Sequence, residues 1–297
     1  KNNNPTRQEV RDWFTKNKNV CRCTGYKQIV DGVMAAAKVM RGEATVEDIT
    51  YKLPEDGEFY GKPIVRPTAL AKVCGVADYG DDQELKMPRN SWHVVMVQPK
   101  VCHHGIIKNI DISEAEKMPG VAKVILAKDI IAAGGTNIMP EGQFHERSKV
   151  TAPSRKVLCD EKIFRWGDVV ALVVADTKER AREAAKKVKV DVEKLPEYLT
   201  YLDAVMPDAI RVHEETPNIF AEQPVLKGVA LEDASKVGDM IEGSDFHVEG
   251  SFHSTREPHL SIEGDTVQAY FDEDGMLTFQ CKSQGVYSAL SRIGNSL

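Results

Sequence analysis

Two cysteines separated by one residue, Cys21 and Cys23, are the side chains of this chain best suited to chemistry. They lie between two segments that have the apolar spacing of helices. Thiols so close in sequence cannot form an unstrained disulfide with each other, so the pair predicts metal ligands. The alternative is a pair of small buried apolar side chains, which is how many free cysteines behave. Gly25 and the helical segment after it favour a ligand turn.

A [2Fe–2S] cluster takes four thiolates, and the other cysteines of the chain stand singly and far apart. They are Cys74, Cys102, Cys159 and Cys281. We therefore expect the two remaining ligands to lie upstream of Lys1, in a longer polypeptide. Both ends fit this expectation, because the chain lacks an initiator methionine or signal sequence and a helical pattern stops at Leu297 without a cap. Unpaired cysteine spacing favours a reducing, cytoplasmic setting.

Composition narrows the classes of function. The chain has 297 residues, of which 42% are hydrophobic and 28% are charged, with a net charge of -6. This balance is that of a globular protein long enough for more than one domain. The net charge and the absence of a dense Lys/Arg cluster argue against a nucleic-acid partner. No apolar run reaches the ~18 residues of a membrane span, so no membrane is expected.

Apolar periodicity predicts two helices that hold the cysteine turn, over residues 4–17 and 26–40. Asn4 is the expected N-cap of the first helix, and Gly42 the end of the second. Together they form half of a small helical bundle over residues 1–42. Repeated prolines and glycines make residues 43–79 a connecting segment.

Residues 80–196 predict a mixed α/β domain. The expected elements are strand 94–97, helix 113–118 capped by Ser113, strand 121–126, a loop over 134–151, and a β-α-β unit of strand 168–175, helix 177–187 and strand 188–192. Residues 197–297 begin a further domain. Its expected elements are strand 246–252 and a hairpin of strands 265–271 and 276–282.

Two histidine-containing pairs are weighed as metal sites and interpreted as structural. His259 and Glu263 stand four residues apart, but in an extended segment rather than on a helix. His103 and His104 point to opposite faces of an extended chain, so they cannot easily chelate one ion and are expected at the surface. The charged residues 178–187 predict a solvated helix face.

The turn Cys-Arg-Cys-Thr-Gly-Tyr, followed by Val-Asp-Gly-Val at 30–33, resembles the second [2Fe–2S] domain of the molybdenum hydroxylases, the family of aldehyde oxidoreductases and xanthine dehydrogenases. The resemblance continues through Arg-Pro-Thr-Ala at 66–69, Lys-Val-Cys-Gly at 72–75 and the segments 157–168 and 170–175. It covers nearly the whole chain and fits the single-chain bacterial aldehyde oxidoreductases best. The resemblance implies an α+β multidomain fold: the C-terminal half of the helical [2Fe–2S] domain at 1–42, and the truncated start of the molybdopterin-binding domain at 197–297.

This resemblance also implies roles for individual residues. Cys21 and Cys23 would bind iron, and Cys23 would also lie against the pterin of a molybdenum cofactor, in a dinucleotide form. Gln284 matches a glutamine that hydrogen-bonds an oxygen ligand of molybdenum, while an amide satisfied at a strand end remains the alternative. The glycine-rich cofactor segments and the glutamate base of the family are not identifiable in this chain. No catalytic residue is assigned, and the chain alone is not expected to be active.

The implied function is oxidation of aldehydes to carboxylic acids with water as the oxygen source. Electrons would leave through the [2Fe–2S] clusters to an acceptor such as a ferredoxin or flavodoxin. Family habit predicts a homodimer that includes the remainder of the enzyme. Two alternatives stay open: an N-heterocycle hydroxylase of the xanthine type, and a non-catalytic electron-transfer or scaffold subunit of a split enzyme.

Overall fold

The computed structural model describes residues 2–21, 25–62, 64–139, 153, 155–220, 230–255, 261 and 263–296. Its contacts divide the chain into two units, Lys1–Ala77 and Asp78–Leu297. Each unit is built around its own packed elements. Among the described helices, none combines the length and the apolar character that crossing a membrane requires.

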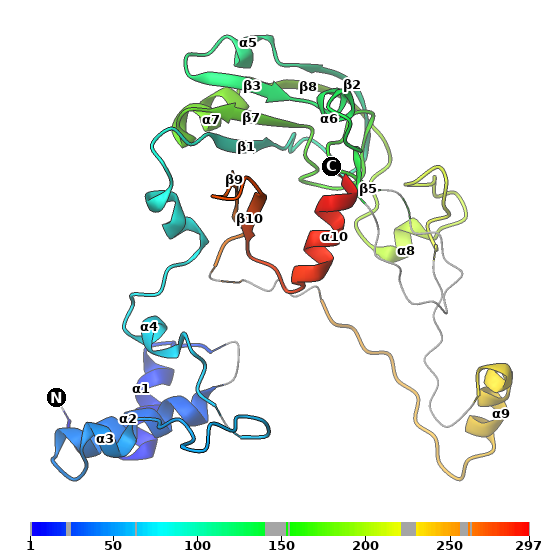
Figure 1. Cartoon of the computed structure of the whole chain (residues 1–297). Coiled ribbons are helices and arrows are strands. Elements are labelled where there is room, and N and C mark those ends of the chain that lie inside the picture. The colour runs from blue at the N-terminus through cyan, green and yellow to red at the C-terminus, as the bar shows by residue number, and fades with distance from the viewer. Residues whose placement is uncertain are drawn as a thin grey trace. The chain divides into compact units, whose positions relative to one another are not determined.

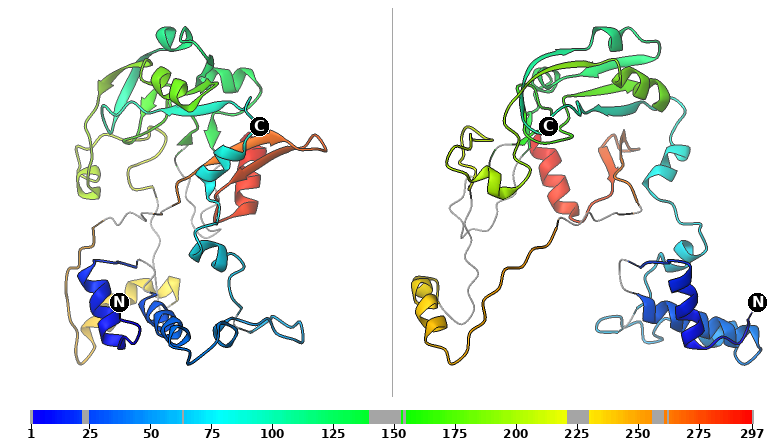
Figure 2. Two further views of the ribbon diagram at one scale, coloured as in Figure 1. Left: turned by 90° about the vertical axis from the view of Figure 1, so that its left-hand side faces the viewer. Right: turned by 180° about the vertical axis from the view of Figure 1, so that it is seen from behind.

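The first unit contains two crossing helices, α1 (Arg7–Lys16) and α2 (Tyr26–Met40), followed by the short helices α3 (Val46–Ile49) and α4 (Ala69–Val73). Helices α1 and α2 contact each other at a steep angle (Figures 1 and 2). Val10 of α1 and Val30 and Ala37 of α2 are the buried apolar residues of the two helices. The expected bounds of α2 are confirmed.

The start of α1 differs from the expectation. Thr6, not Asn4, is the N-cap, because its hydroxyl accepts from the backbone N–H of Glu9 while the Glu9 carboxylate accepts from the backbone N–H of Thr6. This reciprocal capping box satisfies two donors that Asn4 would leave unpaired. Instead, the backbone N–H of Asn4 donates to the side chain of Asn2.

The second unit contains two three-stranded sheets in which the paired strands are antiparallel (Figure 1). One sheet has the order β1-β7-β3, with β1 at His93–Val97, β7 at Ala171–Ala175 and β3 at Val121–Ile125. The other has the order β6-β2-β8, with β6 at Lys162–Ile163, β2 at Gly105–Asp111 and β8 at Lys189–Lys194.

The second unit also contains three short helices, α5 (Ser113–Glu116), α6 (Ala127–Ala132) and α7 (Lys178–Ala185). Helix α7 packs on β1 and β7, and its Ala181 and Ala184 are fully buried. Small side chains at this spacing let the helix approach the sheet closely. Its other face carries charged side chains such as Glu183, paired with Lys186, so the expected solvated face is confirmed.

The predicted β-α-β unit is right in its three elements and wrong in their pairing. Strands β7 and β8 flank α7 in the chain, but they belong to different sheets. A β-α-β unit would need both strands parallel in one sheet. Here β7 is the central strand between β1 and β3, and β8 pairs with β2 at the edge of the second sheet.

Three smaller expectations are also corrected. The N-cap of α5 is Ile112, and Ser113 is the first helical residue, whose backbone N–H is held by the carboxylate of Asp111. The expected loop 134–151 contains a two-residue strand β4 (Ile138–Met139) that pairs with β5 (Arg155–Lys156). Residues 246–252 form no strand, and their large apolar side chains are almost fully exposed.

The remaining elements follow in order along the chain. They are η1 (Gly80–Lys86), α8 (Tyr201–Ala204), η2 (Leu231–Lys236), α9 (Val237–Glu242), β9 (Val267–Phe271), β10 (Leu277–Cys281) and α10 (Val286–Ser296). The predicted hairpin is confirmed, because β9 and β10 pair antiparallel about a turn that Asp272 organises by accepting from the backbone N–H groups of Asp274 and Met276.

Candidate metal centre

The Cys21 thiol lies half-buried in the connection between α1 and α2. The end of α1 directs the chain there, because Lys18 adopts a left-handed backbone conformation with φ 53°. The backbone N–H of Asn19 then donates to the carbonyl oxygen of Phe14 at 3.0 Å. This pattern ends a helix sharply, so the chain reaches Cys21 after only a few residues.

Two hydrogen bonds join Cys21 to the start of α2. The backbone N–H of Gly25 donates to the Cys21 Sγ at 3.4 Å. The backbone N–H of Cys21 donates to the Tyr26 Oη at 2.8 Å. The sulfur and the amide of one residue are thus each fixed to the helix that follows.

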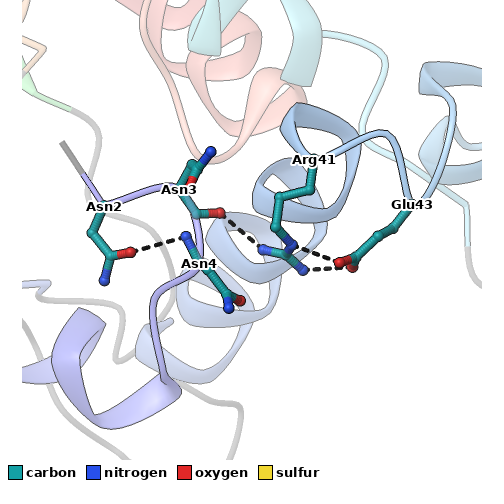
Figure 3. A network of polar contacts seen from close by, with 5 residues as sticks. All are labelled: Asn2, Asn3, Asn4, Arg41 and Glu43. Atoms are coloured by element: carbon teal, nitrogen blue, oxygen red, sulfur yellow. Dashed lines mark hydrogen bonds and ion pairs between the residues drawn. The ribbon is translucent and has the colours of Figure 1, made fainter.

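Helix α2 is itself anchored along its length. Near its first turns, the Arg7 guanidinium of α1 pairs with the Asp31 carboxylate at 2.5 Å. At its C-terminal end, Arg41 donates to the backbone carbonyl of Asn3 at 2.9 Å and makes two hydrogen bonds to the Glu43 carboxylate (Figure 3). The turn therefore sits on a helix that is held in place on both sides.

The chemistry of this turn fits an iron–sulfur ligand. A thiolate bound to iron gains from backbone N–H donors, and Gly25 supplies one to the Cys21 sulfur. The N-terminus of the 15-residue helix α2 adds partial positive charge beside the same sulfur. Cys21 would supply one of the four thiolates of a [2Fe–2S] cluster, and Cys23 lies outside the described residues. Within the described ranges, no three His, Cys, Asp or Glu side chains are grouped as metal ligands.

The other cysteines have different surroundings. Cys102 and Cys159 are buried in the second unit, and burial raises the pKa of both thiols. The pKa of Cys159 reaches about 12, mainly through burial and then through the negative charge of Asp168. A thiol that stays protonated is a packing group, so these two residues serve the core. Cys74 and Cys281 are exposed.

The expectation that His104 lies at the surface is wrong. Its side chain is 2% exposed, and its Nδ1 lies 2.8 Å from the carbonyl oxygen of Pro196. A carbonyl can only accept, so the proton is on Nδ1, and Nε2 has no partner among the described residues. Burial is the main cause that lowers the pKa of His104. His103 is half-buried, with its ring 5.1 Å from that of Trp166.

Another histidine, the half-buried His213, was not singled out from the sequence. Its ring stacks on Phe164 with the centroids 4.5 Å apart. Its Nδ1 is 3.9 Å from the Glu215 carboxylate, too long for a hydrogen bond, and burial lowers its pKa. Neither stacking nor burial of a loop histidine leaves a periodic signal in a sequence. Both histidines fix the segment after β8 to the β6-β2-β8 sheet.

The other predicted site residues belong to the second unit. Gln284 is exposed just before α10, and the next backbone N–H, that of Gly285, donates to the Ser283 hydroxyl. Glu263 is half-buried, and its backbone carbonyl accepts from Lys282. His259 lies outside the described residues, so the structural interpretation of its pair with Glu263 stays a prediction. Sequence reasoning also missed Tyr26, although a hydroxyl directly after a short ligand turn was a usable signal.

Comparison with known proteins extends the resemblance along the chain. Residues 74–196 match the family described as "Aldehyde oxidase and xanthine dehydrogenase, a/b hammerhead domain". The chain is 47% identical over 292 residues to the aldehyde oxidoreductase of Megalodesulfovibrio gigas, and 33% identical over 155 residues to the xanthine dehydrogenase of rice, Oryza sativa. These matches cover 98% and 52% of this chain.

A solved structure agrees with this. The aldehyde oxidoreductase of Desulfovibrio desulfuricans superimposes with a TM-score of 0.82 at 44% identity, over the full length of this chain and 32% of the other. The chain spans 31% of the Megalodesulfovibrio protein and 10% of the rice protein. It therefore corresponds to about a third of the length of the aldehyde oxidoreductases that it matches.

Proposed function

We propose that the chain is part of a molybdenum- and iron–sulfur-dependent aldehyde oxidoreductase, because residues 74–196 match the aldehyde oxidase and xanthine dehydrogenase family of hammerhead domains. The single observation that carries the proposal is the 47% identity to an aldehyde oxidoreductase over 98% of the chain. The α/β sheets of the second unit would be the hammerhead, and the α1–α2 pair would be the C-terminal half of the [2Fe–2S] domain.

The Cys21 turn supports an electron-transfer role for the first unit. Cys21 and Cys23 would bind the iron of a [2Fe–2S] cluster, together with two thiolates from outside this chain. When bound, a molybdenum–pterin group would accept the two electrons released as an aldehyde is oxidised, with water as the oxygen source, and the clusters would carry the electrons away singly. The chain's own residues would position the cluster: Gly25 donates to the Cys21 sulfur, and the Arg7–Asp31 pair keeps α1 and α2 together.

Residues 197–297 would begin the molybdenum-binding domain. Gln284 would donate its side-chain amide to an oxygen ligand of the metal, a neutral donor that adds no charge to the site. Its exposure before α10 leaves the amide available for that contact. Cys23 would lie beside the pterin and provide the route from molybdenum to the cluster. A homodimer that passes electrons to a ferredoxin or flavodoxin completes the proposal.

The two alternatives have weaker support. An N-heterocycle hydroxylase shares the hammerhead family, but the rice xanthine dehydrogenase matches at 33% identity over 52% of the chain. A separate electron-transfer subunit remains compatible with the Cys21 turn, although the similarity to an aldehyde oxidoreductase continues over both units. Comparing turnover of aliphatic aldehydes, aromatic aldehydes and xanthine by the complete enzyme distinguishes the first alternative from the proposal.

Measurement of bound iron tests whether Cys21 is a cluster ligand. The complete protein is purified anaerobically as the wild type, as Cys21→Ala and as Cys74→Ala, and the iron, acid-labile sulfide and visible spectrum of each are measured. Cys21→Ala should lose the iron and sulfide of one cluster, because a thiolate ligand is gone. Cys74→Ala is the matched control, since Cys74 is an exposed cysteine of the same unit. Equal iron content in the two variants would refute ligation at Cys21.

A further inference from the structure

Tyr26 holds the backbone of the residue proposed to bind iron. Its Oη accepts the Cys21 amide N–H at 2.8 Å, across five positions in sequence. Tyr26 is 42% exposed, so tight packing does not explain a tyrosine here. Helix propensity does not explain it either, since phenylalanine would begin α2 equally well. What remains specific to tyrosine is its hydroxyl oxygen.

The two described amides of this turn, those of Cys21 and Gly25, have different acceptors. The Gly25 N–H points at the Cys21 sulfur, whereas the Cys21 N–H is taken by the phenol. Amide hydrogen bonds to cluster sulfurs stabilise the more negative, reduced state, so their number sets the reduction potential. A turn in which one amide is committed to a tyrosine therefore has one fewer donor available to sulfur.

We propose that Tyr26 is a positioning residue of the iron–sulfur centre: it fixes the Cys21 arm of the ligand turn and keeps the Cys21 amide away from the cluster sulfurs, which holds the reduction potential low. This inference rests on the proposed function, because it requires a cluster at Cys21. Gly25 and Tyr26 are consecutive, so these two hydrogen bonds of Cys21 both end at the start of α2. The Arg7–Asp31 pair and the Arg41 contacts that hold α2 thereby also hold the ligand turn.

The test replaces Tyr26 in the complete, metal-loaded protein and measures the cluster directly. Tyr26→Phe removes only the hydroxyl oxygen, and Tyr60→Phe is the matched control because Tyr60 is fully exposed in the same unit. Redox titrations followed by electron paramagnetic resonance give the potential and the g-values of the reduced cluster. Tyr26→Phe should shift the potential to a more positive value and change the g-values, while Tyr60→Phe matches the wild type.

A third replacement isolates the oxygen as an acceptor. Exchange of Tyr26 for p-methoxyphenylalanine keeps the oxygen and removes its proton, so it should restore the wild-type potential that Tyr26→Phe loses. A potential and g-values in Tyr26→Phe identical to those of the wild type would overturn the inference, and so would failure of the methoxy side chain to restore them. If Tyr26→Phe loses its cluster, restoration of iron by the methoxy side chain supports the inference and its failure overturns it. A wild type without the cluster overturns the proposed function instead.

Discussion

Asn137 is expected to stabilise the second unit, because its buried side chain pairs with the backbone of Leu158 as a neighbouring strand would. Its Nδ2 donates to the carbonyl oxygen of Leu158, and its Oδ1 accepts from the Leu158 N–H, both at 2.9 Å. Asn137 is 4% exposed and Leu158 is 1% exposed, so water cannot readily replace either bond. Asn137→Ala leaves one buried donor and one buried acceptor of Leu158 unpaired.

The cost follows from the number of groups left unpaired. A buried polar group without a partner costs about 1–3 kcal/mol, and two are created. Because the asparagine no longer has to be desolvated, the net loss is expected to be about 2–4 kcal/mol. For a domain of this size, each kcal/mol lowers Tm by roughly 2–4 °C, so the melting temperature of the second unit should fall by about 4–16 °C.

Denaturant unfolding of the complete chain, combined with hydrogen exchange at residues 155–159, measures the effect globally and locally. Asn90→Ala is the control, because Asn90 is an exposed asparagine of the same unit. Asn137→Asp keeps the acceptor but sets a carboxylate against the Leu158 carbonyl. It should be destabilised at neutral pH and recover relative to the wild type as the buried carboxyl is protonated. A loss below about 0.5 kcal/mol in Asn137→Ala, with unchanged exchange at Leu158, would refute the reasoning.

Three further predictions concern the ligand turn and the histidines His104 and His213. Gly25→Pro removes the N–H donated to the Cys21 sulfur and should make the cluster potential more negative in a redox titration; Gly25→Ala keeps that donor and should not. His104 and His213 have lowered pKa values, so the unfolded chain binds protons that the folded chain does not; urea titrations should show unfolding free energy falling as pH drops below about 6.5. Lys18→Gly should raise stability by about 0.5–1 kcal/mol in thermal unfolding, because φ 53° suits glycine.

Local elements were the part of the fold that could be predicted from the sequence. Apolar spacing at 3.6 residues located α2 to the residue, and alternation with an Asp-Gly turn located the β9–β10 hairpin. Both patterns record burial of one face against a near neighbour. Pairing between distant strands leaves no such record, which is why β7 and β8 were expected in one sheet but lie in two.

The strand expected at 246–252 shows that alternation of apolar and polar residues is not sufficient to predict a strand. Phe246, Val248 and Phe252 alternate with polar residues, yet each is at least 94% exposed. Alternation indicates that a strand would have one apolar face, but a strand also needs a partner edge for its backbone. The sequence contains no information at these residues about where such an edge would come from. The domain bounds 1–42, 43–79, 80–196 and 197–297 remain predictions, as do the roles of Cys23 and Gln284.

The candidate site likewise contains one residue that the sequence predicted and one that it did not. Cys21 was predicted because a thiol is rare, reactive and informative in its spacing, whereas Tyr26 was not, because its contact runs from a hydroxyl to a backbone amide five residues away. Backbone amides are identical at every position, so no sequence pattern can show which of them a side chain binds. If the amide taken by Tyr26 sets the cluster potential, relatives with the same cysteines but a different residue at this position should differ in potential. Ligand motifs alone would then predict which metal group a protein binds. The hydrogen bonds around the ligands would predict the reduction potential of that group.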